Sequence, residues 1–468
     1  MAECVESELS LWDPERDLVA LPGAPGRSHR LGGRVLAGFE EVRERIVAER
    51  LVKVGKPSSG RSRDPFPTLP AVTVLDASAE PLLRQRVRTV VECLERLVRR
   101  YPCDAELQEF LDVPPVLRRW ILRHVEPEEL RVDFCRLDLL GESLGSVRVL
   151  EFNPSSPGGV ISSGMLHRFW RESSFGDVLA RWGVPEAPME RPEWFADWLI
   201  DYGRERGVRD EDALRVGVFH SRLSTKFELD QVDAQLVRRG RAPVELYPDD
   251  VEGAKALRLG YLKYIPVDAG EVRRWETFCS RMVAADLVVP NALGERWVAE
   301  NKLCLAALSD PRFRRLFTPR QCAALDALVP FGRKLGDGLS EAEAVADREH
   351  LVLKAPYGCR GETVTVGAQT PADAWASLVR DPAYRGWLLQ EHVVASAVET
   401  RDGTYFRDLL VPVLNGRVIG YASRMNRGHL LNGSRGGAAP AVFAPHELCD
   451  TTALPPAGSG SASPTGPA

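Results

Sequence analysis

The sequence predicts a mixed α/β (α+β) protein that is divided into two or three domains. The chain of 468 residues is longer than a single hydrophobic core usually supports. Residues 80–124 carry apolar side chains at three- and four-residue intervals, which indicates helices. Residues 214–248 alternate strand and helix patterns, and residues 350–426 contain several short strand-like runs. These three patterns together favour sheets and helices in separate layers.

The composition argues against several classes of protein. The formal net charge of −5 gives no indication of binding to nucleic acid or to an anionic membrane. No apolar run is long enough to span a bilayer, and the acidic N-terminus lacks the basic and apolar regions of a signal peptide. Nine cysteines without a C-x-x-C pair are typical of free thiols in a reducing compartment. We therefore expect a cytoplasmic protein whose oligomeric state the sequence does not indicate.

The elements follow one another in a clear order. After the N-terminal helices come two strands, at 132–140 and 147–153, separated by a Gly-Glu-Ser-Leu-Gly-Ser turn. The α/β pattern begins at a strand at 214–220 and is expected to end with a third strand within 281–291. Residues 290–344 are predicted to be mostly helical, and clear strands follow at 350–356, 362–367, 386–393 and within 406–426.

The two strands of the hairpin predict a cluster of polar groups. Side chains alternate between the faces of a strand, and the register follows the residues that are buried together. One face is apolar when Leu137 and Leu139 meet Leu150 and Phe152. The opposite face then gathers one cation, two carboxylates and one amide: Arg136, Asp138, Glu151 and Asn153.

Such a face suits one particular chemistry. Two carboxylates and an amide oxygen are hard ligands that fit Mg²⁺. An adjacent arginine fits a phosphoryl or carboxylate oxygen, because its planar fork donates two hydrogen bonds. The alternative is a cross-strand ion pair between Arg136 and Glu151 on a solvated face. The residues alone leave both interpretations open.

Two lysines could reach phosphates at this patch. Lys354 ends an apolar strand and precedes a loop with Gly358 and Gly361, and backbone N–H groups of such a loop can cover phosphates. Lys302 lies near the start of a helix. The alternatives are a plain hairpin with an exposed lysine and a surface lysine on a helix. No helix opens after the glycines, so the loop is neither a Walker A motif nor a dinucleotide fingerprint.

The order of these motifs resembles that of the circularly permuted ATP-grasp family, in particular the carboxylate–amine ligases related to glutathionylspermidine synthetase. That family carries Arg-x-Asp on one strand and Glu-x-Asn on the next, then a small-residue turn. A lysine before a Leu-rich helix, a lysine before a glycine-rich loop and a Gln-Glu strand follow. In unpermuted members the Glu-x-Asn segment comes after the lysines, whereas here it precedes them. The resemblance spans residues 134–443.

The resemblance implies a circularly permuted ATP-grasp fold with an open α/β pre-ATP domain and an N-terminal helical segment. The regions expected are a mostly helical region (1–125), a hairpin with magnesium and substrate residues (126–210), the pre-ATP domain (211–292), nucleotide-binding lobes (293–448) and a disordered tail (449–468).

The resemblance also implies cofactors and roles for single residues. ATP and Mg²⁺ would be the cofactors. Arg136 would stabilise charge on the transferred phosphoryl group. The other implied residues are the metal ligands Asp138, Glu151 and Asn153, the phosphate-binding Lys302 and Lys354, the loop glycines Gly358 and Gly361, and the adenine hinge of Gln390, Glu391 and Val393.

Two segments remain open at this stage. The stretch with Arg424, Asn426, Arg427 and Arg435 either contacts the γ-phosphate or the substrate, or is an ordinary basic loop. The loop after the first α/β strand carries polar residues that either contact a substrate or cap the next helix: Ser224, Lys226 and Glu228. The chain also departs from the family pattern, because Pro-Ser-Ser-Pro follows Glu-x-Asn where Ala-Asp-Thr-Pro is common.

The resemblance implies an ATP-dependent ligase that joins a small-molecule or peptide carboxylate to an amine through an acyl phosphate. Binding to nucleic acid or to a membrane is not expected. Two alternatives stay open. The chain could be a non-catalytic homologue that binds a nucleotide or a peptide, or it could be a small-molecule kinase.

Overall fold

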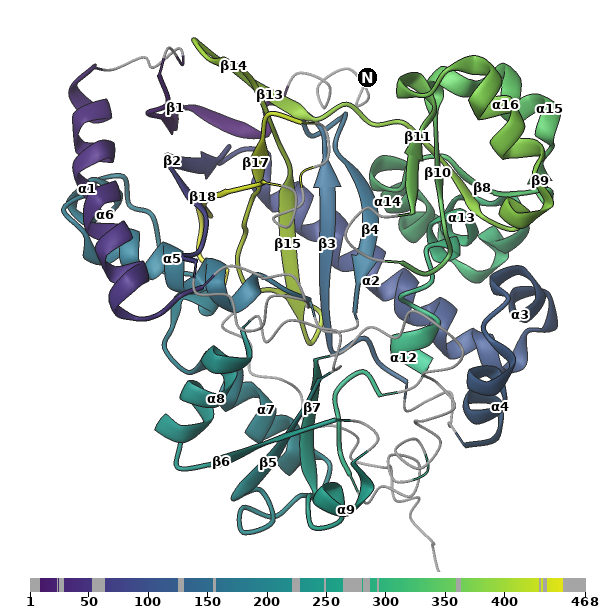
Figure 1. Cartoon of the computed structure of the whole chain (residues 1–468), viewed down its shortest axis with the longest axis horizontal. Helices are drawn as coiled ribbons and strands as arrows, with labels where there is room; N and C mark the ends of the chain where they lie inside the picture. The colour runs from purple at the N-terminus through teal and green to yellow at the C-terminus, as the bar shows by residue number, and fades with distance from the viewer. Residues whose placement is uncertain are drawn as a thin grey trace, which may run out of the picture.

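The computed structural model describes residues 9–22, 24, 29–52, 64–124, 130–154, 157–220, 228–247, 250–263, 280, 287–292, 294–358, 363–428, 431 and 436–448. The fold is mixed α/β, with a central sheet that has a separate group of elements on three of its sides (Figure 1). The expected tail and Gly361 lie outside the described residues.

The central sheet has the order β16-β15-β3-β4 and is antiparallel. Its strands are β3 (Phe134–Leu140), β4 (Arg148–Asn153), β15 (Leu409–Leu414) and β16 (Arg417–Val418). The long helix α2 (Glu80–Arg100) crosses behind the sheet (Figure 1). Buried side chains of α2, β3 and β15 belong to one core, which fixes the apolar face of the sheet.

The hairpin contains a β-bulge that the alternation of polarity did not predict. Asp138 is opposite Glu151, but the next pair joins Leu139 to Val149, which leaves Leu150 as the extra residue. Leu150 therefore falls out of the expected apolar face. Val149 takes its place in the buried core beside Phe152 and the leucines of β3.

A second sheet lies beside β4, with the order β11-β10-β12-β8-β9. Helix α13 (Leu303–Ser309) contacts β8 and β12, and the opposite face packs against α15 (Glu341–Ala346) and α16 (Ala372–Arg380). Residues 290–344 were expected to be mostly helical, yet two strands of this sheet lie there. The strands are β8 (Gly332–Leu335), β9 (Gly338–Leu339), β10 (Leu351–Lys354), β11 (Val364–Val366) and β12 (Leu388–Glu391).

A third sheet joins the two ends of the described chain. Strand β2 (Thr68–Leu75) pairs with β1 (Trp12–Val19) and, in parallel, with β18 (Ala439–Phe443). Helices α1 (His29–Ala48) and α5 (Val160–Glu172) contribute to its core. The N-terminal region is thus not only helical. Strand β2 lies in the middle of this sheet, and its second partner, β18, is more than 360 residues further along the sequence, so no local pattern marked the sheet.

The fourth group is an open parallel sheet, β6-β5-β7. Its strands are β5 (Arg215–His220), β6 (Ala242–Leu246) and β7 (Leu259–Lys263). The third strand was expected within 281–291, but β7 holds this position and Val288 makes only an isolated parallel bridge to it. Parallel strands with crossover helices are the arrangement that the alternating pattern predicted.

The remaining elements connect these groups. A hairpin of β13 (Ser396–Thr400) and β14 (Gly403–Arg407), with β17 (Met425–Asn426) beside it, stands above the central sheet in Figure 1. The other helices are α3 (Ala105–Leu111), α4 (Pro115–His124), α6 (Gly176–Arg181), α7 (Trp194–Glu205), α8 (Leu229–Arg238), α9 (Val251–Ala254), α12 (Gly294–Trp297) and α14 (Pro319–Leu328).

No helix in the described part of the chain is long and apolar enough to cross a membrane. The described cysteines are all free: Cys93, Cys103, Cys135, Cys304 and Cys322. The free thiols agree with the absence of C-x-x-C pairs in the sequence.

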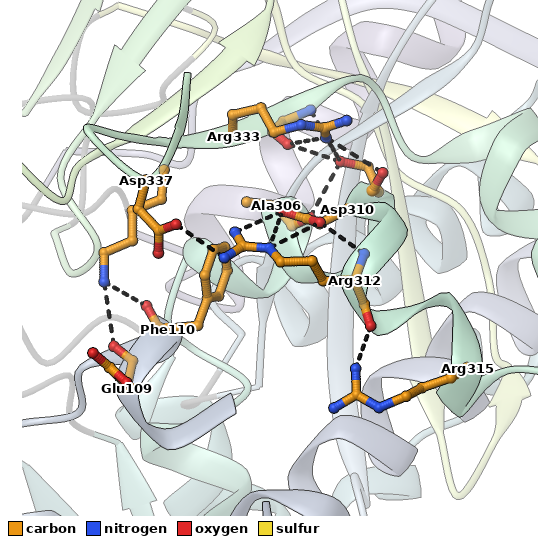
Figure 2. A network of polar contacts seen from close by, with 11 residues as sticks. Glu109, Phe110, Ala306, Asp310, Arg312, Arg315, Arg333 and Asp337 are labelled. Carbon is orange, nitrogen blue, oxygen red and sulfur yellow. Dashed lines mark hydrogen bonds and ion pairs between the residues drawn. The ribbon is translucent and has the colours of Figure 1, made fainter. Parts of the chain in front are cut away.

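A polar network holds the helical region against the second sheet (Figure 2). The buried carboxylate of Asp310 caps the turn after α13 and makes a 2.8 Å ion pair with Arg312. Arg312 also pairs at 2.9 Å with Asp337, whose side chain is 43% exposed. Its guanidinium lies 5.0 Å from the ring centre of Phe110 on α3, and the Phe110 carbonyl accepts a hydrogen bond from Lys334. The network therefore joins α3, the turn after α13 and the segment of β8 and β9.

We expect the buried and the exposed carboxylates of this network to differ in importance. Asp310→Asn removes a buried charge that is opposite Arg312 and should lower the free energy of unfolding by about 2 kcal/mol. Asp337→Asn removes a solvated partner of the same arginine and should cost at most about 0.5 kcal/mol. Urea denaturation measures both values. Equal losses would contradict the importance that we assign to burial.

Candidate functional site

The hairpin brings the predicted polar residues to one place. In the register of β3 and β4, Arg136 is opposite Asn153 and Asp138 is opposite Glu151. Directly opposite residues have neighbouring side chains, so these four form one patch. Arg136 and Asp138 are buried, whereas Glu151 and Asn153 are half-buried. The alternative pair of Arg136 with Glu151 is not among the ion pairs of the described residues.

Asp138 lies at the centre of the patch. Arg136 binds it through two nitrogens, Nε to Oδ1 at 2.6 Å and Nη2 to Oδ2 at 2.9 Å. Arg424, from the segment before β17, donates to Oδ2 at 2.8 Å. Burial alone would raise the pKa of Asp138, but the two guanidinium groups outweigh it and hold the pKa below its ordinary value. Asp138 is therefore ionised and strongly paired.

Lys302 reaches the patch from the start of α13. Its Nζ lies 3.7 Å from Oε2 of Glu151 and donates to the carbonyl of Gly358 at 2.8 Å. Its backbone N–H also donates to Pro356 in the same loop. The lysine thus joins the hairpin to the loop that contains Gly358. Lys302 is buried, so it is not a surface lysine of the helix.

Lys354 reaches the patch from the end of β10 and is buried. Its Nζ donates to the carbonyl of Leu150 at 3.1 Å and to Oε1 of Gln390 at 2.5 Å. The Gln390 amide in turn donates to the carbonyl of Val149. The bulged residues of β4 therefore present main-chain acceptors to the second sheet. Burial lowers the pKa of Lys354 to about 8, with Glu151 opposing the shift.

The three residues of the expected hinge have different surroundings. The side chain of Gln390 is fully buried against Lys354 and β4, so it supports the lysine. Glu391 is exposed and makes two bonds to Phe331, through its backbone N–H at 2.8 Å and its Oε2 at 3.2 Å. The Val393 amide makes no main-chain bond to any described residue. Of the three, Val393 is the most available for a base.

Asp408 is a member of the site that the sequence did not predict. It follows β14, is 3% exposed, and accepts hydrogen bonds from the backbone N–H of Arg424 at 2.6 Å and from its Nε at 2.7 Å. An aspartate between two strands has no motif around it, so no sequence signal marked it. Arg427 is exposed and pairs with Asp402 and Tyr405, as an ordinary loop arginine does. Arg435 lies outside the described residues.

Glu228 also lies close to this patch. It is buried, pairs with Lys263 at 3.2 Å and accepts a hydrogen bond from the backbone N–H of Ser162 at the start of α5. Lys263 contacts the carbonyl of Pro157, and Arg136 donates to the carbonyl of the next residue, Gly158. Glu228 therefore supports the loop that follows the hairpin. Ser224, Lys226, Ser155 and Ser156 lie outside the described residues.

The patch is chemically suited to a polyphosphate anion and a divalent cation. Four basic side chains converge on it, and Glu151 offers a carboxylate whose one described ion pair is long. Glu151 and Asn153 supply hard oxygens of the kind that Mg²⁺ prefers. Among the described residues, no group of three His, Cys, Asp or Glu side chains forms a ready-made metal site.

Comparison with solved structures finds a distant likeness. No protein-family model matches the chain, and no curated protein matches it. Among solved structures, the chain is similar to that of a "Putative gamma-glutamylcysteine synthetase" from Methylobacillus flagellatus KT. The match covers 75% of this chain and 87% of that chain, at 13% sequence identity and a TM-score of 0.36. A TM-score this low does not establish a common fold.

The low pKa of Lys354 predicts how anion binding depends on pH. The ammonium is charged below pH 8 and neutral above it, so the affinity of the patch for a polyphosphate anion, with ADP as the probe, should fall as the pH rises through about 8. Above this pH the affinity should fall by at most about tenfold per pH unit, because Lys354 must take up one proton when the anion binds. Calorimetric titration with ADP between pH 7 and 9.5 measures this slope. Lys354→Arg, which stays charged, should remove it, and an equal slope in both proteins would contradict the assignment.

Proposed function

We propose that the protein is an ATP-dependent carboxylate–amine ligase with a circularly permuted ATP-grasp architecture. The observation that supports this most is the convergence of two lysines on the polar face of the hairpin. Lys302 reaches Glu151, and Lys354 reaches the backbone of Leu150 from a different sheet. Positioned charge is what phosphoryl transfer requires from a protein, since the reaction needs little covalent participation.

The chain order of the site supports the permuted form of the fold. The hairpin with Asp138 and Glu151 precedes both lysines in the sequence, yet all of these residues meet in one patch. The resemblance of the motifs implies this order, and the packing of β4 against the second sheet is compatible with it. The carbonyl of Leu150 is the contact that joins the two parts.

The proposed reaction has two steps. A carboxylate oxygen of the substrate attacks the γ-phosphorus of ATP, the bond to the bridging oxygen breaks, and ADP leaves. The nitrogen of an amine then attacks the acyl carbon, inorganic phosphate leaves with the bonding electrons, and the amine proton passes to solvent. The product is an amide.

The basic side chains would divide the phosphates between them. Lys302 and Lys354 would bind the α- and β-phosphates. Arg136 and Arg424, which lie on either side of Asp138, would hold the transferred phosphoryl group and stabilise its charge. Glu151, Asn153 and Asp138 would hold Mg²⁺. The metal would supply positive charge that neutralises the phosphate oxygens. Val393 would offer its backbone to adenine.

A binding module without turnover is the second candidate. It is favoured by the fact that Asp138 is covered by two guanidinium groups here. The retention of both lysines and both carboxylates of the site speaks against a loss of chemistry. A small-molecule kinase would use the same patch and differ only in the acceptor.

One experiment separates these candidates. The protein is incubated with Mg²⁺, ATP and pooled carboxylates and amines, and ADP release is followed together with mass spectrometry of the products. A ligase releases ADP and forms a product that has lost water. Hydroxylamine added without amine should trap an acyl phosphate as a hydroxamate, whereas a kinase gives a stable phosphate. No ADP release with any pool, together with tight nucleotide binding, would favour the binding module.

Loss of Glu151 should abolish turnover. Glu151→Gln removes the most available carboxylate of the patch while it keeps the size of the side chain, and the rate of ADP release should fall at least about a hundredfold. Glu142→Gln in the exposed turn of the same hairpin is the matched control and should leave the rate unchanged. A Glu151→Gln protein that keeps its rate with a competent substrate pair would overturn the assignment.

A further inference from the structure

Arg424 lies between two buried carboxylates. Asp408 accepts from its backbone N–H at 2.6 Å and from Nε at 2.7 Å, and pairs with Nη2 at 2.6 Å. The same Nη2 donates to Oδ2 of Asp138 at 2.8 Å. Asp408 therefore holds the arginine by three groups, and Asp138 by one. The contact with Asp138 can break while Asp408 still anchors the side chain.

Asp138 has no acceptor position left for a cation. Its Oδ1 accepts from Nε of Arg136 at 2.6 Å and from Nδ2 of Asn153 at 3.2 Å. Its Oδ2 accepts from Nη2 of Arg136 at 2.9 Å and from Nη2 of Arg424 at 2.8 Å. A carboxylate offers about four lone-pair positions, and all of them are used. A metal ion can bind Asp138 only when a donor leaves.

The charge of the patch decides which ligand can cause this change. Its described side chains comprise four bases and three acids, and the net charge is positive: Arg136, Lys302, Lys354 and Arg424 against Asp138, Glu151 and Asp408. A free divalent cation is repelled by such a patch, whereas a polyphosphate is attracted to it. A polyphosphate also offers the guanidinium groups new acceptors.

We propose that Asp408 is a positioning residue that keeps Arg424 as an exchangeable counter-cation on Asp138. A divalent cation then reaches Asp138 only together with a polyphosphate that takes over the guanidinium of Arg424. This inference rests on the proposed function, because it assigns Asp138 to the metal of that site. It adds Asp408 to the site. It also states that the divalent cation binds Asp138 together with the polyphosphate and not before it.

The first test measures cation binding without any nucleotide. Mn²⁺ is titrated into the full chain, and free Mn²⁺ is followed by electron paramagnetic resonance. Arg424→Met removes the counter-cation and should tighten Mn²⁺ binding at least about tenfold relative to the unmodified protein. Adding Asp138→Asn should cancel the gain. Equal affinity with and without Arg424, or a gain that survives Asp138→Asn, would overturn the proposal. Arg424→Gln replaces the methionine variant if that variant does not fold.

The second test isolates Asp408 by a double-mutant cycle. Asp408→Asn leaves Asp138 as the one carboxylate among the described residues that pairs with Arg424. The release of Arg424 then becomes harder, and Mn²⁺ affinity in the presence of ADP should fall about fivefold. In the Arg424→Met background the same change should have no effect. An equal loss in both backgrounds would identify Asp408 as a direct metal ligand and overturn its positioning role.

A control and a separate readout complete the design. Asp402 lies in the turn between β13 and β14, is exposed and pairs with Arg427. Asp402→Asn should leave Mn²⁺ affinity unchanged. Failure of the unmodified protein to bind ADP in the presence of Mn²⁺ would refute the proposed function. The gain of Mn²⁺ binding by Arg424→Met without nucleotide would still decide whether Arg424 covers Asp138.

Discussion

The pairing of β3 with β4 is the constraint on which the site depends. Their register places Asp138 opposite Glu151, and the bulge at Leu150 keeps the apolar side chains on the core face beyond that point. Without the bulge, Val149 would lie on the polar face and Leu150 on the core face, because side chains alternate with a period of two. The bulge also presents the carbonyls of Val149 and Leu150 to the second sheet. One irregularity therefore serves both the core and the site.

Burial explains why the charges of the site occur in pairs. A buried ion without a partner is far more costly than a paired one, so the hairpin can place Asp138 at its centre only with guanidinium groups around it. Asp408 extends this pairing by one step, because Arg424 also requires compensation. The result is a chain from Arg136 through Asp138 and Arg424 to Asp408 that alternates in sign.

The sequence predicted those parts of the site in which neighbours in the chain are neighbours in space. Arg136, Asp138, Glu151 and Asn153 lie on two adjacent strands, so alternation and the apolar pattern were sufficient to group them. Lys354 could be expected at a strand end for the same reason. A bulge, by contrast, depends on how two strands twist together. Asp408 lies more than 250 residues after the hairpin in the sequence and reaches the site through Arg424, so no local pattern marks it.

The same distinction explains the fold. The helices within 80–124 and the parallel sheet follow from local periodicity, whereas β1 and β2 are strands because β18 and tertiary packing complete their sheet. The short strand β8 lies between helices and has too few residues for alternation to be read. Propensity is a weak guide where tertiary contacts decide the structure.

Every cation of the described patch is bound to a protein atom, and this limits which ligands can enter. Lys302 and Lys354 hold carbonyls of Gly358 and Leu150, and the two arginines hold Asp138. A ligand must replace these bonds with stronger ones at the same moment. A monoanion offers too little charge to displace four such contacts, whereas charge-assisted bonds to several phosphate oxygens can do so together. The closed pairing of the site is therefore itself a source of selectivity for polyphosphates over simple anions.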